Sequence, residues 1–249
     1  MPSSLTTLFS CIDNTTLSGT DSVESVAAFC KATAAMQTIE VPHVASVCVY
    51  PLFVETAKKS LAGTSIRVAS VAGGFPAGQI PLNLKLDEIR YAIDSGADEI
   101  DFVINRGRFL QGGENHLFDE VAAAKEACKD HTLKVIIETG ELVDAGHIYS
   151  ASMVSLNAGA DFIKTSTGKI PVGATPFAAY TMLCALRDFI KNNKKEVGFK
   201  AAGGISTPSD ALFYYNLAEK ILKDKNITNQ NFRIGASRLT AKMFKILTE

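Results

Sequence analysis

The sequence lacks any run of about 18 apolar residues, the length that a membrane-spanning helix needs, so we expect no membrane partner. It also lacks an excess of charge of one sign. Its 25 Lys and Arg residues stand against 26 Asp and Glu residues, which gives a formal net charge of -1. A chain this close to neutrality offers no electrostatic case for a nucleic-acid partner. The N-terminal residues show no basic segment before a long apolar core, so we expect no secretory signal.

The cysteines and histidines are few and scattered. The five cysteines are odd in number and form no Cys-x-x-Cys pair, which is typical of reduced thiols in a cytoplasmic protein. The four histidines form no cluster with the spacing of metal ligands, so we expect no metal site.

Length and composition fit one globular domain. The chain has 249 residues, of which 47% are hydrophobic and 20% are charged. Barrels of alternating strands and helices often use about 250 residues as one domain. No linker, low-complexity segment or charge run divides the chain, so we expect a single domain over residues 1–249.

Short apolar strands alternate with helical segments along the chain. Apolar runs of this kind predict a parallel sheet that is buried on both faces. Eight such units predict a closed (β/α)₈ TIM barrel, with an open doubly wound sheet as the alternative. The predicted strands cover residues 9–13, 44–50, 66–72, 99–105, 134–139, 162–166, 198–202 and 232–236. The predicted helices cover residues 21–38, 52–62, 84–95, 114–130, 141–157, 176–192 and 208–223, with a short one after Leu239.

Lysines stand in the middle of two predicted strands, at Lys164 and Lys200. Burying an ammonium group is unfavourable unless it is compensated, and desolvation lowers the pKa of a lysine. A nearby cation lowers that pKa further. A neutral lysine can attack a carbonyl group, so Lys164 is the candidate nucleophile of an imine-forming enzyme, and Lys200 the group that keeps it neutral.

An internal repeat brings an aspartate into the same site. Residues 96–101 and 159–164 both begin Gly-Ala-Asp, and Asp101 falls at the same step as Lys164, 63 residues or about two strand–helix units earlier. Alternate strands of a barrel share an interior layer, so the two side chains can meet. Asp101 is therefore the candidate that donates and accepts protons, working through a water molecule.

Glycines near the ends of three late strands favour an anion site. Glycine lets backbone N–H groups approach a phosphate closely, and barrel enzymes often bind phosphate after strands seven and eight. We therefore expect a small sugar phosphate as substrate. The candidate residues are Gly168, Gly203, Gly204, Gly235, Ser206 and Ser237, and Thr167 either touches the substrate or caps its loop.

Several other residues keep two interpretations. Asp13 fits a turn or a site residue, and Cys48 fits the core better than a site. Lys169 fits a solvated side chain better than a contributor to the site. Gly73 and its neighbouring glycine fit a plain turn. Thr-Gly-Lys at 167–169 looks like the end of an ATP-binding loop, but Ile170 replaces its Ser or Thr, which argues against ATP.

The chain resembles the deoxyribose-phosphate aldolase family over nearly its whole length. The most specific segment is Ala-Asp-Phe-Ile-Lys-Thr-Ser-Thr-Gly-Lys at 160–169, supported by the segments at 47–51, 96–101, 135–140 and 198–204. The resemblance implies a TIM barrel and reversible cleavage of 2-deoxy-D-ribose 5-phosphate to acetaldehyde and glyceraldehyde 3-phosphate. It also implies a cytoplasmic role in deoxynucleoside breakdown, no cofactor, and commonly a homodimer. The roles given above to Lys164, Asp101 and Lys200 match those of the family.

The chain departs from the family at three points. Arg238 follows Ser237 where many members have a second serine, which either strengthens phosphate binding or points away. Gly74 replaces an asparagine of some members, and no tyrosine follows Tyr215, so a tail tyrosine cannot close the site. The competing functions are a transaldolase-like enzyme, a non-catalytic sugar-phosphate-binding barrel and, least favoured, a structural scaffold.

Overall fold

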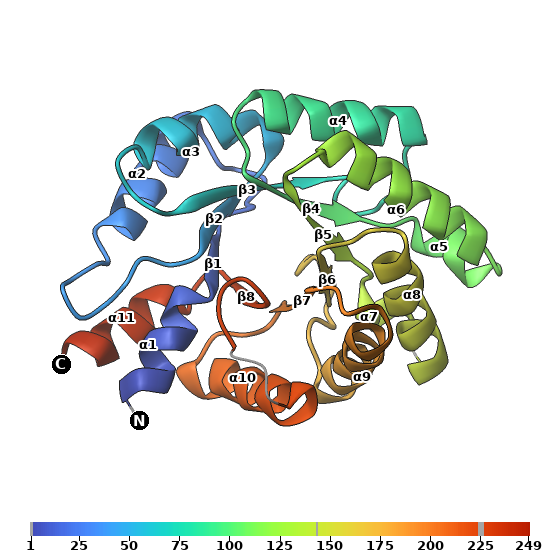
Figure 1. The fold of residues 1–249 in the computed structure, drawn as a ribbon. Helices are drawn as coiled ribbons and strands as arrows, with labels where there is room; N and C mark the ends of the chain where they lie inside the picture. The colour runs from blue at the N-terminus through green and yellow to red at the C-terminus, as the bar shows by residue number, and fades with distance from the viewer. Residues whose placement is uncertain (1, 143, 224–226) are drawn as a thin grey trace.

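A computed structural model describes residues 2–142, 144–223 and 227–249. Within them, eight parallel strands pair in chain order and close into a barrel, with β8 pairing back onto β1 (Figure 1). The predicted TIM barrel is therefore confirmed, and the open sheet is excluded. The strands are β1 Ile12–Thr15, β2 Ser46–Val49, β3 Arg67–Ala72, β4 Glu99–Val103, β5 Thr132–Ile136, β6 Phe162–Lys164, β7 Gly198–Ala202 and β8 Phe232–Ala236.

Helices surround the barrel on the outside, and the N-terminal helix lies beside the C-terminal one (Figure 1). The main helices that follow β1 to β7 are, in order, α2 Val23–Ala34, α3 Val54–Ser60, α4 Leu82–Asp94, α6 Glu114–Cys128, α8 Ala145–Asn157, α9 Pro176–Asn193 and α10 Pro208–Leu222. The remaining helices are α1 Pro2–Ser10, η1 Pro51–Phe53, α5 Arg106–Leu110, α7 Thr139–Leu142 and α11 Thr240–Thr248.

The two faces of each strand have different neighbours, as β4 shows. Ile100 and Phe102 belong to the apolar core, which includes residues of the surrounding helices, whereas Glu99 and Asp101 point into the barrel, where they contact charged groups of other strands. Because side chains alternate along a strand, one strand supplies both the apolar outer layer and a charged interior. The barrel interior is thus unusually polar, and that polarity positions the site described below.

Local signals set the starts of several helices. Ser22 caps α2 in a reciprocal hydrogen-bonded box with Ser25, and Thr207 does the same for α10 with Asp210. Thr175 caps α9, whose first residue is Pro176. These caps hold the helices that follow the strands in place.

The structure corrects some predicted boundaries. The first strand is present but begins and ends later than the predicted 9–13: Pro2–Ser10 form α1, whose Leu8 and Phe9 are buried, and β1 covers Ile12–Thr15. The fifth strand ends at Ile136 rather than 139, because Glu138 takes a left-handed backbone (φ 52°) and α7 begins at Thr139. The predicted helix at 141–157 is split into α7 and α8; Val143, within it, lies outside the described residues.

Candidate active site

The strand register places the two predicted lysines side by side. Lys164 of β6 pairs in register with Lys200 of β7, and both side chains point into the barrel. Their ammonium groups donate to the same oxygen of Asp101, Oδ2, at 2.6 Å from Lys164 and 2.7 Å from Lys200. The predicted proximity of Asp101 and Lys164 is confirmed. All three side chains are buried, which excludes the surface interpretation of the lysines.

Three further charged side chains support this cluster and were not predicted from the sequence: Glu99, Lys134 and Arg233. Lys134 of β5 donates to the second oxygen of Asp101 at 2.8 Å and contacts Glu99 of β4 at 2.6 Å. Arg233 of β8 contacts Glu99 at 2.8 Å and Asp13 at 2.7 Å. Charged residues at alternate positions of predicted strands were the available signal, because such positions face the barrel interior.

Burial and charge act in opposite directions on the two lysines. Burial lowers the pKa of Lys164, and Lys200 adds to that effect, while Asp101 opposes it without fully offsetting it. Burial also lowers the pKa of Lys200, but contacts with Asp101 and Asp13 outweigh it and raise the pKa above its usual value. Lys164, whose described carboxylate contact is Asp101 alone, is thus the lysine more readily deprotonated.

The carboxylates of the cluster are held in the ionised form. Burial alone raises the pKa of Asp101, but Lys134, Lys164 and Lys200 outweigh burial and bring this pKa well below its usual range. Burial is likewise outweighed for Asp13, by Lys200 and Arg233. The interior is therefore a set of alternating full charges rather than a set of neutral hydrogen-bonding groups.

A cavity of about 570 Å³ opens above Lys164, large enough for a small sugar phosphate. It contains three cationic side chains, Lys164, Lys169 and Arg238, and no carboxylate among the described residues that line it. Every residue proposed from the sequence for substrate or phosphate lines this cavity. They are Thr167, Gly168, Gly203, Gly204, Gly235, Ser206 and Ser237.

Two backbone features shape the rim of the cavity. Gly203 has a φ of 88°, and a Cβ atom there would lie 2.9 Å from the Cα atom of Gly173, so the two loops approach closely only because both residues are glycines. Gly235 lies within β8 rather than after it, which corrects its expected position. Glu138 accepts hydrogen bonds from the backbone N–H and hydroxyl of Thr167, which fixes the loop after β6.

The structure also places the residues whose interpretation was open. Asp13 is fully buried and contacts Lys200 at 2.5 Å, so it belongs to the charged cluster and not to a turn. Cys48 is buried against Leu17 and against Ala69 and Val71 of β3, and it is not among the residues that line the cavity. Lys169 lies at the cavity rim, where its ammonium group donates to the carbonyl oxygen of Leu17.

The structure also places the glycine turn after β3 and Arg238, the residue at which the loop after β8 departs from the family pattern. The backbone N–H groups of Gly73 and Gly74 donate to Glu88 at 2.7 and 2.8 Å, which is a plain turn away from the cavity lining. Arg238 lines the cavity, so this departure from the family pattern adds a cation to it.

Neither a metal site nor a membrane span is found in the parts that the structure describes. No group of three or more His, Cys, Asp or Glu residues there could hold a metal ion. None of the helices at 2–142, 144–223 and 227–249 is long and apolar enough to cross a membrane.

Comparisons with known proteins agree with this geometry. Residues 7–232 match the model of the DeoC/LacD family of aldolases. A mouse deoxyribose-phosphate aldolase is 47% identical over 92% of this chain and 76% of its own length, and a cattle deoxyribose-phosphate aldolase is 44% identical over 93% and 76%. A tetrameric deoxyribose phosphate aldolase from Aeropyrum pernix superposes with a TM-score of 0.78 at 25% identity, over 99% of this chain and 93% of that one. The chain therefore belongs to the DeoC/LacD family of aldolases.

Proposed function

We propose that this chain reversibly cleaves 2-deoxy-D-ribose 5-phosphate through an imine formed on Lys164. The observation that carries this proposal is a buried, readily deprotonated lysine below a cationic cavity of sugar-phosphate size. The substrate comes from the relatives named deoxyribose-phosphate aldolase. The same site supports a role in deoxynucleoside breakdown, because that process releases phosphorylated deoxyribose.

The chemistry begins with the lone pair of the Lys164 amine. Its nitrogen attacks the C1 aldehyde carbon of the open-chain sugar to give a carbinolamine, and loss of water gives a protonated imine. The imine draws the C2–C3 bonding electrons toward nitrogen as the C3 hydroxyl loses its proton. Glyceraldehyde 3-phosphate leaves, C2 of the remaining enamine takes up a proton, and hydrolysis of the resulting imine releases acetaldehyde.

Asp101 is the group proposed to move protons through a water molecule. With all three lysines charged, its oxygens face three ammonium groups and bind a proton weakly. When Lys164 is neutral, one of those charges is absent, so the proton affinity of Asp101 rises in the reactive form of the site. Lys200 keeps its proton in both forms, because it contacts Asp13 as well as Asp101.

The phosphate group is proposed to sit at the opposite end of the cavity from Lys164. There the backbone of Gly203 and Gly204 takes positive φ values, and Ser237 and Arg238 line the wall. Helix α11 begins just beyond them, and no side chain caps its N-terminus. A helix N-terminus without a side-chain cap suits a phosphate.

Borohydride trapping tests the proposal. Reduction in the presence of deoxyribose 5-phosphate is expected to add a stable adduct to the peptide that contains Lys164, seen by mass spectrometry. Lys164→Ala should lose the adduct, whereas Lys59→Ala, which removes an exposed lysine of α3, should keep it. No adduct in a folded protein that binds the sugar phosphate would favour the non-catalytic barrel. An adduct on Lys200 would reverse the two roles.

Substrate choice, location and assembly need separate measurements. Turnover of deoxyribose 5-phosphate but not fructose 6-phosphate is expected, and the reverse would indicate the transaldolase-like alternative. The five cysteines are free thiols, which supports the proposed cytoplasmic location. The homodimer that the family resemblance implies stays a prediction, which light scattering tests.

A further inference from the structure

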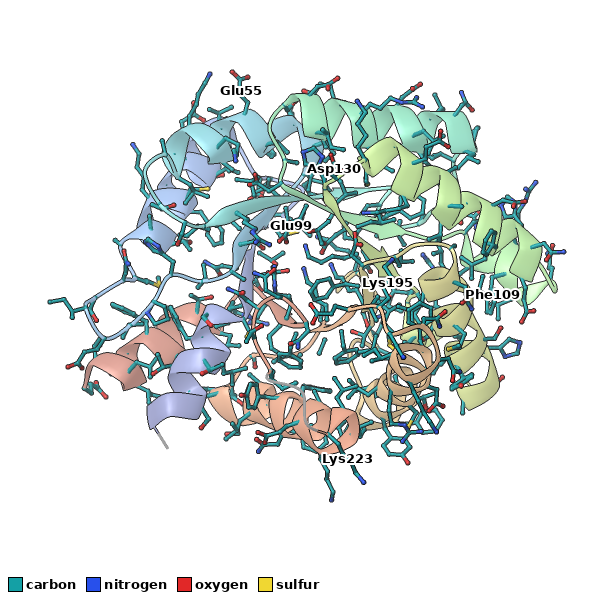
Figure 2. All side chains as sticks on the ribbon, in the orientation of Figure 1. Glu55, Glu99, Phe109, Asp130, Lys195 and Lys223 are labelled. Atoms are coloured by element: carbon teal, nitrogen blue, oxygen red, sulfur yellow. The ribbon has the colours of Figure 1, made fainter. Side chains whose placement is uncertain are left out.

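The charged groups inside the barrel form a closed ring of alternating sign. Each member contacts one oppositely charged neighbour on either side, and all six are essentially inaccessible to solvent. The successive contacts are Asp101–Lys134 at 2.8 Å, Lys134–Glu99 at 2.6 Å, Glu99–Arg233 at 2.8 Å, Arg233–Asp13 at 2.7 Å, Asp13–Lys200 at 2.5 Å and Lys200–Asp101 at 2.7 Å. Figure 2 shows Glu99 in the barrel interior, among the strands.

The charges of this ring cancel. It holds three carboxylates and three cations, and Lys164 is attached to it as a seventh group through Asp101 alone. A protonated Lys164 would therefore be a surplus positive charge in a buried neutral assembly. Every ring cation has at least two carboxylate contacts, and Lys134 has a third, to Asp13 at 3.7 Å, so Lys164 is the group that can lose its proton at the least electrostatic cost.

None of the six ring members is among the described residues that line the cavity, which Lys164 alone reaches from this cluster. Glu99 and Arg233 contact each other on the side of the ring away from Asp101, and neither is a hydrogen-bond partner of Lys164. Glu99 pairs with Lys134, which contacts Asp101, and Arg233 pairs with Asp13, which contacts Lys200. The two residues therefore complete the ring and stabilise the charged forms of Lys134 and Asp13.

We infer that Glu99 and Arg233 are positioning residues whose opposite charges keep the ring neutral and thereby set the pH above which the Lys164 amine is free to react. The inference rests on the proposed imine chemistry, but neither residue touches the substrate in it. Their influence is electrostatic, so the sign of the charge removed decides the direction of the effect.

Besides each other, Glu99 faces Lys134 of β5 and Arg233 faces Asp13 of β1 within the ring, and both have further neighbours outside it. Glu99 also contacts Arg67 of β3 at 3.1 Å, and Arg67 is partly exposed at 40%. Arg233 lies over the ring of Phe162 on β6 and donates to the Asn229 carbonyl oxygen at 2.5 Å. The titratable groups facing Lys164 itself are Asp101 on β4, Lys200 on β7 and the Cys48 thiol on β2.

The experiment measures the pH profile of kcat/KM, whose acid limb reports the ionisation of essential groups in the free enzyme. Glu99→Gln adds net positive charge to the ring, so the acid limb should move to lower pH. Arg233→Met adds net negative charge, so the limb should move to higher pH. Each shift should be about one pH unit, which is smaller than the shift expected from a charge in direct contact with Lys164. The double variant restores neutrality and should return the limb toward its original position.

Opposite shifts separate this proposal from a merely structural role, because loss of packing would lower activity without moving the two limbs in opposite directions. Asp87→Asn and Arg90→Gln are matched controls, since they make the same charge changes in an exposed ion pair of α4. Neither should move the limb. Limbs that stay in place, or that move in the same direction in both ring variants, would overturn the inference.

Folding and trapping keep the test decisive. Each ring neighbour retains one opposite partner after a single substitution, so the variants are expected to fold. If neither ring variant folds, Arg67→Gln is measured in their place. This variant removes a positive charge that is partly screened by solvent, so the acid limb should move to higher pH by about 0.3 unit. An unchanged acid limb in Arg67→Gln would overturn the inference. Failure to trap an adduct on the wild-type protein with borohydride would refute the imine mechanism. If an adduct is trapped but the acid limbs of the ring variants do not move, only the proposed role of the ring is refuted.

Discussion

Asp101→Asn removes the one negative charge that three buried ammonium groups share. The amide keeps the size of the side chain and one acceptor oxygen, so the change is mainly electrostatic. Lys134, Lys164 and Lys200 then lose an ionic partner at 2.8, 2.6 and 2.7 Å.

The size of the effect follows from burial. Removing one partner of a buried ion pair typically destabilises a protein by about 3–5 kcal/mol. Here Lys134 keeps Glu99, Lys200 keeps Asp13, and Lys164 can release its proton, so we expect about 3 kcal/mol. Loss of the proposed proton carrier should lower kcat by about 10²–10⁴-fold.

Two assays measure these effects separately. Urea denaturation gives the change in the free energy of unfolding, and a coupled assay for glyceraldehyde 3-phosphate gives kcat and KM. Asp87→Asn, in an exposed pair with Arg90, is the control and should change neither by a measurable amount. An Asp101→Asn protein with kcat within tenfold of wild type would refute the proton-carrier role, and unchanged stability would refute the charge accounting.

Three further outcomes are expected. Gly203→Ala should raise KM and lower the free energy of unfolding by about 2–3 kcal/mol, because its new Cβ atom would clash with Gly173. Gly204 has a similar φ but no atom within 4 Å of an added Cβ atom, so Gly204→Ala should lose about 1 kcal/mol in thermal or urea unfolding. Equal losses in the two variants would contradict the argument from close approach. The pKa of buried Glu99 is lowered to about 2, so this carboxylate stabilises the fold fully above its unfolded pKa near 4 and loses that contribution as the pH falls. Acid titration followed by circular dichroism should therefore show stability falling from about pH 4 toward pH 2. Unchanged stability over that range would contradict the ionised state of the buried carboxylates. Burial raises the pKa of the Cys48 thiol to about 11, so iodoacetamide at pH 8 should modify the partly exposed Cys184 first by peptide mapping, and faster alkylation of Cys48 would contradict its burial.

Local sequence signals were enough for the barrel and for the centre of the site. Alternating apolar strands and helices predicted the closed sheet, because a parallel strand buried on both faces leaves few other architectures. The Gly-Ala-Asp repeat predicted that Asp101 and Lys164 meet, because equal strand starts two units apart give equal heights in a barrel. The bounds of the first strand were predicted too early, because Leu8 and Phe9 suit a buried helix face as well as a strand.

Only the tertiary structure decided which charges meet across the barrel. Glu99, Lys134 and Arg233 come from three different strands and have no shared motif in the chain. Whether an inward charge finds a partner depends on strand tilt and register around the closed sheet, which no single strand encodes. The fold, the candidate nucleophile and the glycines of the candidate anion site could therefore be predicted from residues that are neighbours in the chain. Closure of the barrel decided the charge balance around that nucleophile, because electrostatic energies in a buried site depend on distances between residues that are remote in the chain.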